Sequence, residues 1–338
     1  MDYGFSKEIL ARSKETYLLP DRYVEDMSMH ARALVMSLIL FSFLSPPHVC
    51  GEKGGEGSDM GQKPALILGY SSQLFYGVEV NDAKAATKVW TDTLIRRQGV
   101  FKKSDTIIIQ DLPSLEKAAN AKAVDIIIML PQEFIEIRNK IPFEPVFSSA
   151  ISSGVYEEFI LLVRKDRGIE KLSDLRGKKL LVETGQRGTI PTFWLDILLA
   201  RERLPEGKEF FSSIKELNKI SQVVLPVFFR QADACLASRL AFETMSELNP
   251  QVGKELKAIA TSPGFLTGVI CFRRDFYAQY KDHLDDSLRS LHTDPQGKQI
   301  LTLFRVNQLI PFEPSHLETV DALLKEHRIL KARLAKRK

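Results

Sequence analysis

The stretch KKLLVETGQRGTIPTFWLDILLA, residues 178–200, joins a strand-like run to a helix-like run through a short turn. Residues 178–184 are rich in aliphatic side chains, and residues 189–200 are apolar over a length typical of a helix. Pro191 fits the first turn of that helix, because a missing N–H there costs no intrahelical hydrogen bond. This strand-turn-helix unit predicts an α/β fold.

Three further strand-like runs precede this unit. They are ALILGY at 65–70, DTIIIQ at 105–110 and VDIIIM at 124–129. Their unbroken apolar character favours parallel strands that are covered on both faces. Between the first two runs, apolar residues recur at steps of three and four from Ala83 to Leu94, which indicates an amphipathic helix. This region therefore predicts a βαβ unit.

We expect two lobes, each a mostly parallel sheet with flanking helices. The 338 residues exceed the ~250–300 at which a single hydrophobic core stops growing. Two long strand candidates, at 155–164 and 266–274, flank the second set of α/β elements, so the chain is expected to cross between the lobes twice. The predicted parts are a segment upstream of both lobes (1–63), the first part of lobe 1 (64–158), lobe 2 (159–266), and a return to lobe 1 that ends in a helix (267–338).

The upstream segment predicts export. Residues 33–44, ALVMSLILFSFL, are typical of the apolar region of a signal peptide and fall short of the ~20 residues of a membrane-spanning helix. Residues 46–63 contain five glycines among charged residues, which favours a flexible tether. The alternative is a buried helix within the domain.

The signal-like run begins well inside the printed chain, so we expect translation to start at Met27 or Met29. Cleavage is expected before Glu52. A lipid anchor at Cys50 is the alternative, although Pro47 and Val49 fit a lipobox poorly. The expected location is the periplasm or another extracytoplasmic compartment.

The distribution of charge and the spacing of cysteines and histidines argue against nucleic-acid binding and metal binding. Five of the eight residues from Lys331 to Lys338 are basic, and without these five charges the net charge of +4 falls to −1. Nucleic acid is therefore not an expected partner, because a basic face rather than a basic chain end carries that function. The three cysteines and six histidines show no metal-binding spacing, and Cys235 and Cys271 lie in apolar runs that predict a core position.

The chain resembles the phosphate/phosphonate-type periplasmic solute-binding proteins of ABC transporters over about residues 64–315. The stretches that carry the resemblance are VRKDRGIEKLSDLRGKKLLVETG at 163–185, QADACLASRLAFETM at 231–245 and ATSPGFLTGVICFRRD at 260–275. VDIIIMLPQEF at 124–134 is similar to the family segment that ends a strand with a turn at the ligand cleft. The resemblance implies a type II periplasmic-binding fold, whose two lobes close on a small solute and deliver it to an ABC permease.

In open α/β sheets, ligands bind beyond the carboxyl ends of strands, which places the cleft among the turns after residues 69, 130 and 184. In the last of these turns, the N–H groups of Gly188 and Thr189 are available to an anion at the start of a helix. Arg187, next to Gln186, can add a bidentate contact with a carboxylate or phosphonate. The alternative is a tight glycine turn with Arg187 in solvent.

Phosphonate binders of the family carry a Ser/Thr-rich turn at this position, whereas this chain has Gly185, Gln186 and Arg187. This departure argues against phosphonate itself. It leaves an anionic or polar solute as the expected ligand.

Other turns supply further candidates. Tyr70, Ser71 and Ser72 follow the first strand and can donate hydrogen bonds or stack on a ligand. Gln132 and Glu133 follow Pro131, where Glu133 can fill or negatively charge the pocket, or can simply favour the start of a helix.

Asp233 and Ser238 begin and end a strand of the second lobe. The sequence leaves two roles open for these residues. They can contact the ligand or the hinge, or they can simply cap a helix.

An enzyme of the same fold, such as a chorismate-type lyase, is the main alternative function. The sequence has no GxSxG, P-loop or GxGxxG motif, so we expect no catalytic residue and no cofactor. A ligand-sensing domain for a membrane signalling partner and a cytoplasmic effector domain are further alternatives. We expect a monomer.

Overall fold

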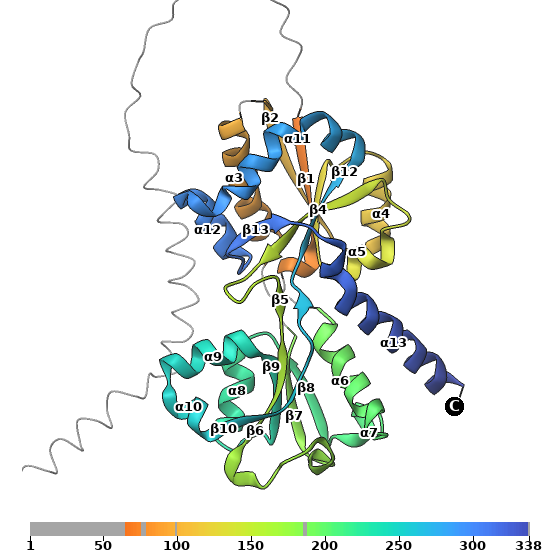
Figure 1. The fold of residues 1–338 in the computed structure, drawn as a ribbon, viewed down its shortest axis with the longest axis vertical. Helices are drawn as coiled ribbons and strands as arrows, with labels where there is room; N and C mark the ends of the chain where they lie inside the picture. The colour runs from red at the N-terminus through yellow and green to blue at the C-terminus, as the bar shows by residue number, and fades with distance from the viewer. Residues whose placement is uncertain (1–64, 76–78, 99, 185–187, 337–338) are drawn as a thin grey trace, which may run out of the picture. The chain divides into compact units, whose positions relative to one another are not determined.

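The computed structural model describes residues 65–75, 79–98, 100–184 and 188–336. Its strands form a six-stranded sheet, a five-stranded sheet and a two-stranded sheet (Figure 1). We call the six-stranded sheet with its helices the first lobe, and the five-stranded sheet with its helices the second lobe. The signal-like run at 33–44 and the glycine-rich segment after it lie outside the described residues.

The first lobe has the strand order β13-β4-β12-β3-β1-β2. Its strands are β1 (Ala65–Ser71), β2 (Lys103–Ile109), β3 (Ile126–Met129), β4 (Phe143–Ala150), β12 (Val269–Arg273) and β13 (Gln308–Pro311). β1 pairs in parallel with β2 and β3, whereas β12 is antiparallel to β3 and β4. The three strand-like runs of the sequence are thus confirmed as β1, β2 and β3, and every residue of β3 is buried.

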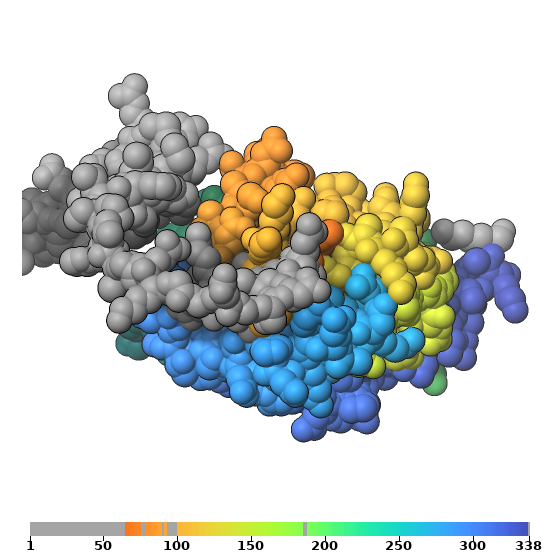
Figure 2. Space-filling view, turned by 90° about the horizontal axis from the view of Figure 1, so that it is seen from above, coloured from red at the N-terminus to blue at the C-terminus, as the bar shows by residue number. Residues whose placement is uncertain are grey.

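The helices of the first lobe are α3 (Val80–Gln98), α4 (Leu112–Asn120), α5 (Pro131–Ile137), α11 (Arg274–Arg289) and α12 (Pro295–Leu303). α3 is the helix predicted between the first two strands. α11 packs beside α3 although about 180 residues of chain separate them, and Figure 2 shows their orange and light-blue surfaces on one face. The first lobe therefore combines early and late segments of the chain.

The second lobe has the strand order β10-β6-β9-β7-β8. Its strands are β6 (Phe159–Arg164), β7 (Lys179–Glu183), β8 (Ser213–Leu217), β9 (Ala234–Ser238) and β10 (Leu256–Thr261). Its helices are α6 (Ile190–Arg201), α7 (Gly207–Phe210), α8 (Ile220–Phe228), α9 (Arg239–Leu248) and α10 (Pro250–Glu255). β7 and α6 form the predicted strand-turn-helix unit, and β7 is parallel to both β8 and β9.

Both larger sheets are mixed rather than mostly parallel as the sequence predicted, because the strand by which the chain enters each sheet from a crossing segment runs antiparallel to the parallel strands of that sheet. β6 is antiparallel to β9, as β12 is to β3. Cys235 in β9 and Cys271 in β12 are buried free thiols, as their apolar runs predicted.

Two short strands carry the chain from one larger sheet to the other. β5 (Tyr156–Glu157) and β11 (Phe265–Leu266) pair antiparallel as the two-stranded sheet. The two long strand candidates are therefore interrupted, one at Glu158 and the other at Thr267 and Gly268. The interruptions arise because each segment leaves one set of strand partners and joins another.

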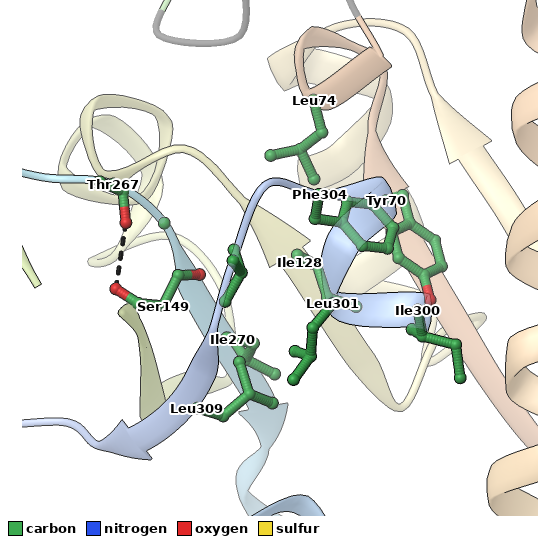
Figure 3. Close-up of a pocket in the computed structure, with 12 residues that line it drawn as sticks. Tyr70, Leu74, Ile128, Ser149, Thr267, Ile270, Ile300, Leu301, Phe304 and Leu309 are labelled. Atoms are coloured by element: carbon green, nitrogen blue, oxygen red, sulfur yellow. Dashed lines mark hydrogen bonds between the residues drawn. The ribbon is translucent and has the colours of Figure 1, made fainter. Parts of the chain in front are cut away.

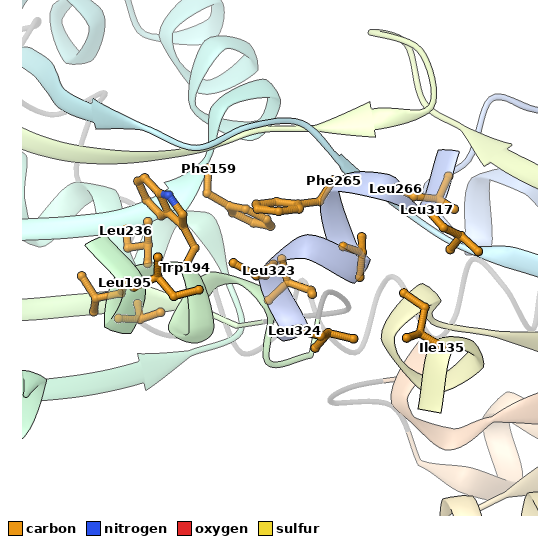
Figure 4. Close-up of a cluster of buried hydrophobic side chains, with 14 of the residues drawn as sticks. Ile135, Phe159, Trp194, Leu195, Leu236, Phe265, Leu266, Leu317, Leu323 and Leu324 are labelled. Atoms are coloured by element: carbon orange, nitrogen blue, oxygen red, sulfur yellow. The ribbon is translucent and has the colours of Figure 1, made fainter. Parts of the chain in front are cut away.

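The last helix, α13 (Glu318–Ala335), contacts both α5 and α6. Its buried residues Val320, Leu323 and Leu324 join a hydrophobic cluster that also contains Ile135 of α5 and Trp194 of α6 (Figure 4). Burial of each such side chain contributes about 1.5–3 kcal/mol, so this helix is a substantial part of the core. Within the described ranges, no helix is both long and apolar enough to cross a membrane.

Candidate ligand-binding site

The start of α5 is fixed to the end of β1 by Glu133. Its carboxylate accepts hydrogen bonds from the Leu130 backbone N–H at 2.9 Å and from the Ser71 hydroxyl at 2.6 Å. Burial raises the pKa of the Glu133 carboxyl above its ordinary value, and the two hydrogen bonds oppose part of that rise. Pro131 occupies the first helical position, where its missing N–H costs no hydrogen bond.

Gln132 of the first lobe lies directly against Gly188 of the second lobe. A side-chain carbon on Gly188 would lie 2.8 Å from Nε2 of Gln132 and 3.2 Å from Cδ1 of Leu130. Gly188 also has a φ of +59°, a conformation that other residues rarely adopt. Both the backbone and the available space therefore favour glycine, and the fold brings together two residues that were predicted from separate turns.

The start of α6 is the place where the sequence predicts an anion site. The helix begins at Ile190, Pro191 lies in the first turn, and no side-chain hydrogen bond from Thr189 caps it. N–H groups in a first turn have no intrahelical acceptor, so this end of the helix suits a polar or anionic group. Gln186 and Arg187, predicted for the same turn, lie outside the described residues.

Ser238 connects two buried carboxylates, one in the crossing strand β5 and one in β7 of the second lobe. Its hydroxyl donates to Oε1 of Glu157 at 2.6 Å, and its backbone N–H donates to Oε2 of Glu183 at 3.1 Å. The Ser238 oxygen also accepts from the Ala241 N–H at 3.3 Å, which caps α9. Ser238 is therefore both a helix cap and a polar group between two acidic side chains.

A small cavity of about 10 Å³ lies among these elements. Its wall includes Leu130 and Gln132 of the first lobe, Glu157 and Ile190 on the other side, and Thr267 of the crossing segment. A cavity must offer roughly 10–15 Å³ to hold one water molecule. Among the described residues, this cavity therefore has no space for a solute larger than water.

Tyr70, within β1, and Ser72, directly after it, contact protein and do not line this cavity. The buried Tyr70 ring stacks on Phe304, with ring centroids 5.8 Å apart, and burial raises the pKa of its hydroxyl. The Ser72 hydroxyl donates to the carbonyl oxygen of Gln110 at 3.1 Å. Of the three residues predicted there, Ser71 is the one linked to α5.

Asp233 does not join the candidate site, which corrects the sequence-based assignment. Its carboxylate accepts from the Lys179 N–H at 2.9 Å and pairs with Arg167 at 3.1 Å. Asp233 precedes β9, whereas Ser238 ends it, and a strand of five residues separates its ends by about 16 Å. The two residues therefore lie at opposite edges of the sheet.

Sequence reasoning missed Glu157 and Glu183. Glu183 ends a parallel strand, and a carboxylate at that position was a usable signal. Glu157 gave no such signal, because it stands next to Glu158 in an apolar run whose burial depends on distant segments. Among the described residues, no group of three or more His, Cys, Asp or Glu side chains is arranged to hold a metal ion.

Comparison with known proteins identifies the family to which this chain is similar. The family described as "ABC transporter, phosphonate, periplasmic substrate-binding protein" matches residues 81–317, which is more than half of the chain. A search of curated proteins found no significant match in sequence.

Solved structures share the fold at low sequence identity. XAC2383 from Xanthomonas citri, bound to ATP, is 14% identical with a TM-score of 0.58, covering 79% of this chain and 98% of that one. PhnD1 from Prochlorococcus marinus, in complex with methylphosphonate, is 13% identical with a TM-score of 0.55, covering 78% and 98%. The binding protein PA3383 from Pseudomonas aeruginosa is 15% identical with a TM-score of 0.51, covering 82% and 99%.

These likenesses confirm the α/β, type II periplasmic-binding fold that the sequence predicted. The family match extends from α3 to the segment before α13 and covers every strand of both larger sheets except β1. The chain therefore belongs to the phosphonate-type periplasmic substrate-binding proteins of ABC transporters.

Proposed function

We propose that this protein captures a small anionic or polar solute by closure of its two lobes, without chemical conversion, and releases it to an ABC permease. The solute-binding role follows from the family. The ligand class, the binding residues and the closure are the proposal. The observation that carries it is the contact of Gln132 with Gly188, which sets the start of α5 against the start of α6.

The proposed binding groups come from both lobes. Ser71, Gln132 and Glu133 act from the first lobe. Gln186, Arg187, Gly188, Thr189 and Ser238 act from the second. The anionic or most polar end of the solute is bound at the start of α6, where N–H donors and Arg187 favour negative charge.

The buried carboxyl groups near the site indicate that the ligand carries hydrogen-bond donors. Glu157 and Glu183 both contact Ser238, and Glu133 lies beside Gln132 at the start of α5. Of these three residues, Glu157 lines the small cavity, and a solute with acceptors alone would lie beside its carboxylate without donating to it, which is unfavourable in a buried site. We therefore infer a solute that also carries hydroxyl or ammonium donors.

Movement of the lobes is part of the proposal. The cavity of about 10 Å³ between Gln132 and Glu157 holds no solute in this conformation. The chain passes between the two larger sheets through β5 and β11, which are two residues long each. Short crossing segments of this kind are suited to a hinge that opens and closes around a ligand.

A thermal-shift screen tests this function with the full chain. The panel contains phosphate, alkylphosphonates, aminoalkylphosphonates, sulfonates, hydroxy acids, amino acids and neutral polyols. A ligand present at 100 times its Kd adds about 2.7 kcal/mol to the free energy of unfolding. Stabilisation by a solute with both acceptors and donors is expected. A panel in which no small polar molecule stabilises the protein would refute the proposal.

The family operates outside the cytoplasm, and we propose that residues 33–44 act as the export signal. Mass spectrometry of protein from the native host is expected to find a chain that starts near Glu52 or Cys50. An intact upstream segment on protein in the cytosol would contradict this. Sedimentation of the purified chain is expected to give a monomer.

A further inference from the structure

A second cavity, of about 50 Å³, lies inside the first lobe (Figure 3). One wall is formed by side chains of the six-stranded sheet, including Ile128, Ile270 and Leu309. The opposite wall includes Ile300 and Leu301 of α12. All five side chains are at most 8% exposed, so the cavity is an apolar space within the core.

The two ends of this cavity differ in polarity. At one end, the stacked rings of Tyr70 and Phe304 form part of the wall. At the other end are Ser149 and Thr267, where the Thr267 hydroxyl donates to the Ser149 carbonyl oxygen at 3.0 Å. Cavities lined mainly by apolar side chains remain dry and accept small apolar molecules. The cavity therefore suits a hydrocarbon group better than water.

Thr267 also lines the smaller cavity, whose wall includes the polar side chains of Gln132 and Glu157. β3 and the residue directly after it border the two spaces, because Ile128 lines the apolar cavity and Leu130 lines the smaller one. Thr267 is therefore part of the wall of both cavities.

We propose that the 50 Å³ cavity is a subsite for a short alkyl group of the bound solute, with Thr267 between the alkyl group and the polar end. The polar end of this arrangement rests on the proposed function. A cavity of about 150 Å³ holds benzene, so 50 Å³ accommodates about two carbon atoms. Each methylene group that enters is expected to raise affinity about fourfold.

Titration calorimetry of the full chain with 1-aminoalkylphosphonates and α-amino acids, each with a straight alkyl group from methyl to hexyl, tests the subsite. In at least one series, affinity is expected to rise about fourfold per methylene over about two steps and then to stop rising. Leu301→Phe fills the cavity and is expected to abolish the rise, whereas Leu301→Ala enlarges it and should extend the rise to longer chains.

The matched control is Leu303→Phe, because Leu303 is on the same helix but is 50% exposed. This variant is expected to keep the wild-type dependence on chain length. An affinity that does not change with chain length in the wild type, or that rises equally in Leu301→Phe, would overturn the subsite.

Xenon separates failure of the subsite from failure of the proposed function. If no series binds, the proposed ligand class fails, and the ¹²⁹Xe chemical shift then decides whether the apolar cavity accepts a guest. The wild type and Leu303→Phe are expected to shift the xenon signal, and Leu301→Phe is expected to lose most of that shift. Equal xenon shifts in the wild type and Leu301→Phe would overturn the proposal independently of any polar ligand.

Discussion

The imidazole ring of His327 stacks on the phenyl ring of Phe193, with centroids 3.8 Å apart and ring planes inclined by 15°. Nε2 of the same histidine lies 3.1 Å from Oδ2 of Asp196, so one side chain of α13 makes two contacts with α6. On the other side, Asp321 of α13 pairs with Arg138, next to α5, at 3.4 Å. α13 is therefore attached to elements of both lobes.

We expect His327→Ala to lower the free energy of unfolding by about 2 kcal/mol, because it removes a buried ring contact and a hydrogen bond to a carboxylate. Urea unfolding measures the loss. His283→Ala is the control, since His283 is exposed on α11 and its loss should change stability by less than about 0.5 kcal/mol. Equal stability of His327→Ala and the wild type would show that α13 is not held by this contact.

Gly188→Ala is expected to impair both stability and binding. The positive φ alone costs an alanine about 1 kcal/mol, and the new carbon would lie 2.8 Å from Nε2 of Gln132. Affinity for the ligand found in the screen should fall by at least about tenfold.

Gly168→Ala is the matched control for this variant. Gly168 has a similar φ of +65°, but no atom lies within 4 Å of the added carbon. It should lose about the same 1 kcal/mol of stability and keep its affinity. Equal affinities for the two variants would show that Gly188 is not part of the binding site.

Glu133→Gln is expected to change how stability depends on pH. Because burial raises the pKa of Glu133 above the ordinary 4.5, ionisation costs more in the folded than in the unfolded chain. The stability that the protonated carboxyl contributes is present below the unfolded pKa and is lost as pH rises through the folded pKa. The free energy of unfolding of the wild type, relative to Glu133→Gln, should therefore fall between pH 4 and pH 7.

Urea unfolding at several pH values measures that difference. Glu247→Gln, at an exposed position on α9, is expected to show no such trend relative to the wild type. A difference between wild type and Glu133→Gln that stays constant or increases with pH would contradict the effect of burial.

Arg187→Ala tests the contact with the charged end of the ligand that the sequence predicted. Hydrogen bonds to charged groups contribute about 1.5–3 kcal/mol, so affinity should fall at least about tenfold while the unliganded protein keeps its stability. Arg333→Ala, in the basic end of the chain, is expected to change affinity little. Titration calorimetry that finds equal affinities for wild type and Arg187→Ala would place Arg187 outside the site.

The sequence by itself determined the order of elements and the family. Unbroken aliphatic runs predicted β1, β2 and β3, because a strand covered on both faces needs apolar side chains at every position. Pro191 predicted the start of α6, because proline is tolerated only where no intrahelical donor is required. Gly188 and Gln132 were candidates from the sequence because each follows the carboxyl end of a strand, and the structure shows that they lie against each other.

The tertiary structure alone decided which side chains meet. The contact between Gln132 and Gly188, the burial of Glu157 and the placement of Asp233 at the far edge of its sheet all depend on segments distant in the chain. Periodicity along one element predicts which of its faces is buried, but it does not indicate which other element packs against that face. Long-range packing decides which elements meet. The strands could therefore be predicted from the sequence, whereas the set of residues around the small cavity at the start of α5 could not.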